Sequence, residues 1–191
     1  AALSSDPSSV DGSAEETRCN ELPNDAILAL TIGARCNNAR LVPTGDGSDE
    51  WKIIGDPTEG ALLVLARKGG VSLDSGKILY ELPFDSDRKA MSVVVEHDGK
   101  RWMYTKGAPE VILERSNSEL RDGESIALDE TRRSEIAKAN GAMASRAMRV
   151  LSLACRELPS TNDGEFDEHD LTFVGLVGMI DPPRDEVREA V

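Results

Sequence analysis

The sequence has few of the side chains that build metal centres and covalent active sites. Its cysteines, Cys19, Cys36 and Cys155, are widely spaced, and no C-x-x-C pair occurs. That spacing favours neither a zinc site nor a disulfide framework, and free thiols fit a reducing compartment. The histidines, His97 and His169, lie in predicted loops without a partner serine or cysteine at a catalytic spacing. We therefore expect neither a metal site nor a catalytic residue in this chain.

Long apolar runs and the common active-site glycine motifs are missing as well. The most apolar run, residues 171–180, is far shorter than the ~20 residues that a membrane helix needs. The first residues, A-A-L-S-S-D-P, lack the charged start and apolar stretch of a signal peptide. No G-x-x-x-x-G-K-[ST], G-x-G-x-x-G or G-x-S-x-G motif occurs. These absences predict a chain without direct membrane contact and argue against a stand-alone kinase or hydrolase.

Positive charge is scarce. Lysine and arginine number 22 against 35 aspartates and glutamates, which gives a formal net charge of −13. Nucleic acid and anionic membranes attract positively charged surfaces, so we expect this chain to bind neither. A small charged ligand responds to its pocket more than to the net charge, and a local basic pocket is compatible with this composition. The length of 191 residues suits one domain with a fragment of a neighbour.

Strand-like and helix-like patterns alternate along the chain and predict an α+β fold. Strands are expected at residues 51–55, 78–84, 90–96, 101–105, 149–157 and 171–180, and helices at 26–35, 56–70, from 108 onward and at 129–147. The Asp98-Gly99 dipeptide predicts a hairpin between two of the strands. Together these elements predict an antiparallel twisted sheet of about six or seven strands flanked by helices. Residues 1–20, rich in Ser, are predicted to form a flexible arm.

Local capping signals fix the start of two predicted helices. Asn24 or Asp25 is the expected cap of the first helix. In the second, Asp56 is a good N-cap, Pro57 fits the first helical position, and Glu59 completes a pattern similar to a capping box. Two glycines after the helix predict its end.

Four short segments combine turns with charged or aromatic residues. Residues 56–59 place carboxylates at a helix start, and residues 84–92 place a phenylalanine at a strand end, where an exposed ring can stack on a base. Lys106 precedes a glycine that allows close approach to the backbone. Arg149 opens a strand and suits phosphate as a bidentate donor. Each segment taken alone is explained better by helix capping or solvated surface charge than by ligand binding, and no segment is decisive by itself.

Taken in order, these segments resemble a known set. They are G-D-P-T-E, F-D-S-D-R-K-A-M-S-V, K-G-A-P-E, R-V-L-S-L-A and D-P-P-R, and they run from about residue 20 to the end of the chain. The chain thereby resembles the nucleotide-binding domain of P-type cation-transporting ATPases. The sequences of its motifs are most similar to those of bacterial members of the calcium-pump branch. The ordered set is highly specific, whereas K-G-A-P-E alone is only moderately so.

The resemblance implies a set of residues around an adenine ring. Phe84 matches the aromatic side chain that stacks on adenine. Glu59 matches the carboxylate near the adenine amine, with Thr58 beside it. Met91 matches an apolar contact to the ring, and Leu151 matches an apolar wall of the same cavity.

The resemblance also implies basic residues along the nucleotide. Lys106 matches the lysine that lines the adenine cavity, and Gly107 follows it. Lys89 matches a basic residue beside the nucleotide, and Arg149 matches the arginine that reaches the phosphates. Since the chain is acidic overall, such cations would offset the repulsion of a polyphosphate.

The match departs from the animal calcium pumps at one position. Those pumps have an arginine two places after the stacking phenylalanine, where this chain has Ser86. The next arginine, Arg88, follows two residues later. The resemblance therefore supplies no phosphate contact at this position.

The resemblance implies a nucleotide-binding domain at residues 21–180 and a hinge toward a phosphorylation domain in residues 181–191, matched by Asp181, Pro182, Pro183 and Arg184. The family's D-K-T-G-T, T-G-E and G-D-G-x-N-D stretches are absent. The expected partners are therefore ATP and the phosphorylation and actuator domains of the same pump, with Mg²⁺ bound mainly outside this chain. Alone, the chain is expected not to hydrolyse ATP.

The implied whole protein is an integral membrane pump whose cytoplasmic domain presents the γ-phosphate of ATP to an aspartate elsewhere. The transported cation implied by the resemblance is Ca²⁺. Two alternatives stay open at this point: a pump for another cation, such as Na⁺/K⁺ or H⁺, and a protein-interaction module that binds no nucleotide.

Overall fold

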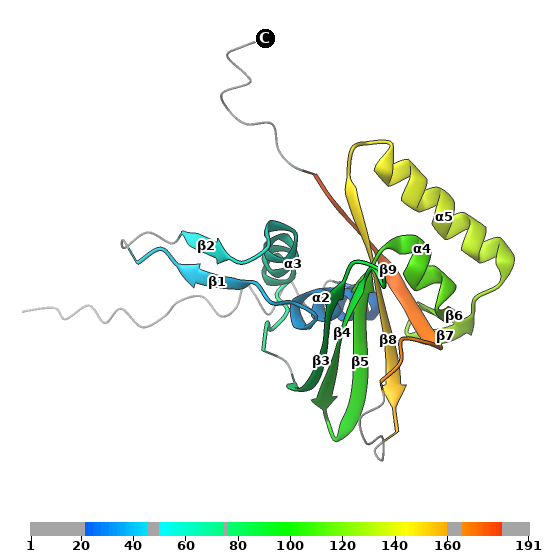
Figure 1. The fold of residues 1–191 in the computed structure, drawn as a ribbon, viewed down its shortest axis with the longest axis horizontal. Helices are drawn as coiled ribbons and strands as arrows, with labels where there is room; N and C mark the ends of the chain where they lie inside the picture. Colours follow the sequence, from blue (N-terminus) through cyan, green and yellow to red (C-terminus); the bar gives the residue numbers. More distant parts are fainter. Residues whose placement is uncertain (1–21, 46–49, 75, 160–165, 181–191) are drawn as a thin grey trace, which may run out of the picture.

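The computed structural model describes residues 22–45, 50–74, 76–159 and 166–180 (Figure 1). The predicted arm at residues 1–20 and the predicted hinge residues Asp181, Pro182, Pro183 and Arg184 lie outside these ranges. Within the described ranges, no helix is both long and apolar enough to cross a membrane.

A mixed sheet forms the centre of the described residues, with seven strands in the order β3-β4-β5-β8-β9-β6-β7 (Figure 1). Its strands are β3 (Lys77–Asp85), β4 (Ala90–His97), β5 (Lys100–Gly107), β6 (Ser116–Arg121), β7 (Glu124–Ala127), β8 (Arg149–Leu158) and β9 (Leu171–Met179). Within this sheet β6 and β9 pair in parallel, and the other neighbours pair antiparallel. The predicted α+β class is confirmed, and the sheet departs from the antiparallel expectation where β9 inserts between β8 and β6.

Helices cover both faces of the sheet. They are α2 (Asn24–Arg35) on one face and α4 (Pro109–Glu114) and α5 (Glu130–Ala144) on the other. Helix α3 (Pro57–Lys68) packs mainly against α2. Successive side chains of a strand point to opposite faces, so Met91 and Val93 contribute to different clusters from their neighbours. Met91 and Val93 pack with Ile32 of α2, whereas Val94 packs in the cluster that contains Ile112 of α4.

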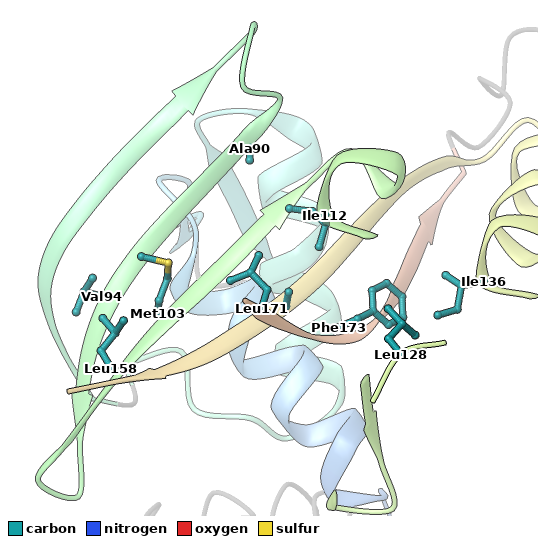
Figure 2. Close-up of a cluster of buried hydrophobic side chains, with 10 residues drawn as sticks. Ala90, Val94, Met103, Ile112, Leu128, Ile136, Leu158, Leu171 and Phe173 are labelled. Carbon is teal, nitrogen blue, oxygen red and sulfur yellow. The ribbon is translucent and has the colours of Figure 1, made fainter. Parts of the chain in front are cut away.

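The larger core lies between the sheet and helices α4 and α5. Figure 2 shows Ile112 and Ile136, from these helices, directed toward Leu171 and Phe173 of β9. These side chains are 5% exposed or less. Burial of this apolar surface holds β9 in the middle of the sheet, with a favourable free energy of roughly 2 kcal/mol for each large side chain.

A small second sheet lies apart from the seven-stranded sheet. A two-stranded sheet of β1 (Arg40–Pro43) and β2 (Trp51–Ile54) precedes α3.

Helix α2 begins after Pro23 without a side-chain cap, so the predicted capping by Asn24 or Asp25 is wrong. The Asp25 carboxylate instead accepts the backbone N–H of Gly123 at 2.9 Å, a tertiary contact that competes with local capping.

Buried thiols lie on the α2 face of the sheet. Cys36 and Cys155 are both free and buried. Burial raises the pKa of each thiol to about 12, and the Cys36 Sγ donates to the Met91 carbonyl at 3.2 Å. These two thiols therefore behave as small core side chains rather than as nucleophiles.

Candidate functional site

A cavity of about 720 Å³ opens where α3 begins, β3 and β5 end, and β8 begins. Its walls come from segments that are far apart in the sequence. The lining residues are Asp56, Thr58, Glu59, Phe84, Lys89, Lys106, Gly107, Ala108, Pro109, Glu110, Arg149, Val150 and Leu151. A cavity of this size is large enough to hold a small-molecule ligand.

The structure brings together eight of the nine residues that the resemblance places around a nucleotide. Thr58, Glu59, Phe84, Lys89, Lys106, Gly107, Arg149 and Leu151 all line the cavity. Met91 does not: its side chain is 1% exposed and packs in the core with Ile32 and Cys36. In the sheet, Met91 of β4 is the register partner of Lys106 of β5. It therefore lies beside the lysine without lining the cavity.

The start of α3 is fixed by the predicted cap. The Asp56 carboxylate accepts the backbone N–H groups of Thr58 at 2.8 Å and Glu59 at 3.2 Å. Desolvation raises the pKa of Asp56, but the hydrogen bonds from Glu59 and Thr58 and the charge of Arg149 outweigh it and hold the pKa below its usual value. The cap thus orients Thr58 and Glu59 toward the cavity.

Replacing Asp56 with alanine is expected to lower the free energy of unfolding by about 1 kcal/mol, the usual effect of losing an N-cap. Because the folded-state pKa of Asp56 is depressed, its ionised form stabilises the domain above the unfolded-state pKa, and this contribution disappears as the pH falls below about 4. Urea unfolding of the wild type and of the Asp56→Asn and Asp56→Ala variants, measured from about pH 3 to about pH 7 and thus across the ordinary carboxylate pKa, tests both parts.

Asparagine also caps helices, so Asp56→Asn is expected to retain most of the stability at neutral pH. It should also lose the part of the acid dependence that comes from this carboxylate. An unchanged acid dependence in both variants would contradict the role given to Asp56.

A buried ion pair forms the floor of the cavity. The Lys106 ammonium donates to Oε1 of Glu59 at 2.6 Å, and the two side chains are 8% and 16% exposed. The other Glu59 oxygen accepts the backbone N–H of Asn38 at 3.1 Å, and the Asn37 amide donates to the Glu59 carbonyl at 2.8 Å. Lys106 itself is held on β5 between β4 and β8. Its partner therefore comes from a helix start 47 residues away in the sequence.

Phe84 is an exposed aromatic residue of the cavity wall. Its side chain is 63% exposed at the end of β3, although large aromatic side chains usually bury most of their surface. The turn after it is closed by the Asp85 carboxylate, which accepts the backbone N–H groups of Asp87 at 3.0 Å and Arg88 at 2.8 Å. Lys89 ends the turn with a positive φ of 50°. The ring is thus presented by a defined turn rather than by core packing.

Gly107 allows two chain segments to meet at the cavity wall. A Cβ at this position would lie 2.6 Å from the Lys89 carbonyl oxygen and 3.1 Å from Ala90 Cα. The next amide, that of Ala108, donates to the same Lys89 carbonyl at 3.0 Å. The glycine therefore permits the turn with Lys89 to lie directly against the end of β5.

Charges of both signs surround the cavity. Lys89 and Glu110 lie 3.5 Å apart at the mouth, where both side chains are more than half exposed. Arg149 donates to the Thr58 hydroxyl at 2.5 Å. An exposed flat ring, a carboxylate with a lysine partner and exposed cations at the rim are together suited to an aromatic ligand that carries anionic groups.

Residues 26–186 match the family model described as "P-type ATPase, cytoplasmic domain N". The chain belongs to this family. The N domain of this chain is 44% identical over 169 residues to a "Calcium-transporting ATPase" of Bacillus subtilis, covering 85% of the chain and 19% of that protein. It is also 43% identical over 142 residues to "Calcium-transporting ATPase 1" of Bacillus cereus, covering 72% of the chain and 16% of that protein.

A cyanobacterial relative is similar in extent. The N domain is 40% identical over 179 residues to "Cation-transporting ATPase pma1" of Synechocystis, covering 89% of the chain and 19% of that protein. The chain thus spans about a fifth of the length of these relatives or less. The family named by the resemblance is confirmed.

Five lining residues of the N domain were not among the predicted site residues. They are Asp56, Ala108, Pro109, Glu110 and Val150. All of them lie within three positions of a predicted site residue and inside the motifs G-D-P-T-E, K-G-A-P-E or R-V-L-S-L-A. Their motif membership was the available signal, but sequence alone does not tell which side chains of a motif face a cavity.

The arginine near the stacking position of the N domain does not line the cavity. Arg88 donates to the Ala90 carbonyl at 3.0 Å and lies 3.5 Å from the Glu168 carboxylate. Ser86, at the position where animal calcium pumps have arginine, is exposed on the same turn. Within the described ranges, no group of three or more His, Cys, Asp and Glu side chains is placed to hold a metal ion.

Proposed function

We propose that this N domain binds ATP in the cavity described above and presents the γ-phosphate to an aspartate in a separate phosphorylation domain of the same pump. The observation that carries the proposal is the exposed Phe84 ring beside the buried Lys106–Glu59 pair. The base stacks on Phe84 against the apolar wall of Leu151. Stacking of a base on an aromatic side chain contributes about 1–3 kcal/mol.

The carboxylate in the floor supports recognition of an amino group on the base. Glu59 accepts the Lys106 ammonium on one oxygen and the Asn38 amide on the other. A carboxylate has about four acceptor positions, so lone pairs remain for a ligand amine. Adenine has such an amine, whereas guanine has a carbonyl at the corresponding position.

The phosphates extend toward the open rim, where Lys89 and Arg149 provide positive charge. Both cations already have protein partners, Glu110 and Thr58. The triphosphate must therefore compete for them, and few groups hold it. We expect weak binding of the isolated chain, with a dissociation constant of roughly 1 mM, or about −4 kcal/mol.

The rest of the reaction lies in other parts of the pump. Mg²⁺ accompanies ATP and is bound mainly outside this chain, and it neutralises charge on the transferring phosphoryl group. The chain alone is proposed not to turn over ATP, because the D-K-T-G-T stretch with the family's phosphorylated aspartate is absent from the sequence. The phosphorylation and actuator domains of the same pump are the proposed partners.

The transported cation proposed for the whole pump is Ca²⁺. Two of the relatives described above are calcium-transporting ATPases, and the third is named only as cation-transporting. A pump for another cation is the alternative. Transport of radioactive Ca²⁺ by vesicles containing the full-length pump, with Na⁺, K⁺ and H⁺ as competitors, distinguishes the two.

Amide NMR during an ATP titration tests the proposed binding. We expect saturable shifts concentrated at Glu59, Phe84, Lys106 and Arg149, and no comparable shifts at Phe84 with inorganic triphosphate, which lacks a base. Absence of any shift up to roughly 10 mM ATP, ten times the expected dissociation constant, would overturn the proposal. It would favour a protein-interaction module that binds no nucleotide.

A further inference from the structure

A buried carboxylate outside the cavity contacts the turn that follows Phe84. Glu168 is 5% exposed. One of its oxygens accepts an Arg115 N–H at 2.5 Å, and the other lies 3.5 Å from the Arg88 guanidinium and accepts the Ser92 hydroxyl at 2.6 Å. A buried charge is stable only with such partners. Both carboxylate oxygens of Glu168 are thus engaged on the protein side.

The hydroxyl groups give this contact a defined direction. Ser92 and Thr105 are fully buried, and their oxygens lie 2.8 Å apart. An ionised carboxylate only accepts hydrogen bonds, so the single Ser92 proton is directed to Glu168. Thr105 must then donate to Ser92. Glu168 is therefore anchored to β4 and β5, and Thr105 is the residue immediately before Lys106.

Arg88 transmits this anchoring to both ends of the turn. Its guanidinium donates to the carbonyl of Pro83, directly before Phe84, and to that of Ala90 at 3.0 Å. The Arg115 guanidinium approaches the Arg88 carbonyl at 3.5 Å. One arginine side chain thus joins the two strands where the turn begins and ends.

The turn needs support of this kind. The Phe84 ring is mostly exposed, so core packing does not fix its position. Lys89 has a positive φ, a conformation that non-glycine residues rarely adopt without tertiary constraint. The main chain between these residues therefore decides where the ring and the Lys89 ammonium stand at the cavity.

We propose that Glu168 is a positioning residue of the nucleotide site, which acts through Arg88 and Arg115 to hold the turn carrying Phe84 and Lys89. Glu168 does not line the cavity, so its proposed effect is indirect. The effect on ATP rests on the function proposed above, whereas the effect on the turn does not. Two separate measurements therefore distinguish failure of this inference from failure of the proposed function.

The chain offers a matched control for a Glu168→Gln variant. Glu119 is equally buried, at 3% exposed, and is also paired with two arginines, Arg121 and Arg132. It lies on β6, in another part of the sheet from the turn. Glu119→Gln therefore removes the same charge from a similar environment without contacting the turn.

The first measurement is amide hydrogen exchange of the ligand-free protein. The Lys89 amide is bonded to the Asp85 carbonyl at 2.7 Å and the Ala108 amide to the Lys89 carbonyl at 3.0 Å. In Glu168→Gln we expect both to exchange roughly tenfold faster relative to the core amide of Val94, because local opening of the turn becomes easier. In Glu119→Gln the same ratio is expected to stay at its wild-type value.

The second measurement is ATP affinity by NMR titration. Glu168→Gln is expected to weaken ATP binding roughly fivefold, since a less ordered turn must be ordered on binding, and Glu119→Gln is not. Equal exchange ratios in the two variants overturn the inference, as does unchanged ATP affinity with a loosened turn. If the wild type binds no ATP, the proposed function fails, and the exchange ratio still decides whether Glu168 holds the turn.

A second substitution keeps the test valid if Glu168→Gln does not fold. Arg88→Lys retains a positive charge near Glu168, but an ammonium does not reproduce the planar fork that reaches two carbonyls. The same increase in exchange at Lys89 and Ala108 is expected. Unchanged exchange in a folded Arg88→Lys protein counts against the inference.

Discussion

Replacing Phe84 with alanine is expected to weaken ATP binding about tenfold or more, because stacking on one aromatic ring contributes about 1–3 kcal/mol. The free energy of unfolding should change by less than about 0.5 kcal/mol, since the side chain is mostly exposed. The measurements are ATP titration by NMR and urea unfolding of the same samples. A large loss of affinity at constant stability is a property of a ligand contact rather than of a core residue.

The same strand supplies the control. Tyr80 is another exposed aromatic residue of β3, but its ring lies 5.0 Å from that of Phe166 and does not line the cavity. Tyr80→Ala is expected to leave ATP affinity at the wild-type value. Equal losses of affinity in both variants would mean that β3 is disturbed as a whole and that Phe84 has no special contact.

Replacing Lys106 with methionine is expected to lower the free energy of unfolding by about 3 kcal/mol and to abolish measurable ATP binding. Methionine keeps most of the volume but leaves the Glu59 carboxylate buried without its cation, and breaking a buried pair on one side costs about 3–5 kcal/mol. Because Glu59 retains the Asn38 amide as a partner, the lower end of that range applies. Urea unfolding and ATP titration measure the two effects.

Two further variants test whether the unpaired Glu59 charge causes the loss of stability. Adding Glu59→Gln to Lys106→Met removes the unpaired charge and is expected to restore most of the stability, but not ATP binding. Lys89→Met breaks the exposed pair with Glu110 and is expected to change stability by less than about 1 kcal/mol. If Lys106→Met unfolds at the wild-type urea concentration, the pair does not stabilise the fold as described.

Local sequence signals correctly predicted the elements whose causes lie within a few residues. Asp56 and Pro57 begin α3 as expected, and the Asp98-Gly99 dipeptide forms the two-residue hairpin with positive φ at both positions. The equivalent Asp122-Gly123 turn joins β6 and β7, two strands that are not among those expected from the sequence. Caps and turns are predictable because their hydrogen bonds join residues that are only about two to four positions apart in the sequence.

Contacts between segments far apart in the sequence were harder to predict. The parallel pairing of β6 with β9 depends on where β9 inserts, and that position follows from packing against α4 and α5. The Asp25 side chain likewise makes a tertiary contact instead of a local capping bond, since its carboxylate accepts the Gly123 N–H. In both cases a contact between distant segments replaces the local preference, which is the usual limit of propensity-based prediction.

The family, the α+β class and the residue types of the candidate site follow from motif order and hydrophobic period, which are properties of the chain. Which side chains meet at the site depends on the folded chain. It brought Glu59 to Lys106 and Thr58 to Arg149 across 47 and 91 residues, and it turned Met91 into the core. Strand register, which follows from burial of the whole core, decides which residues become neighbours, and it therefore brings distant segments together at the cavity.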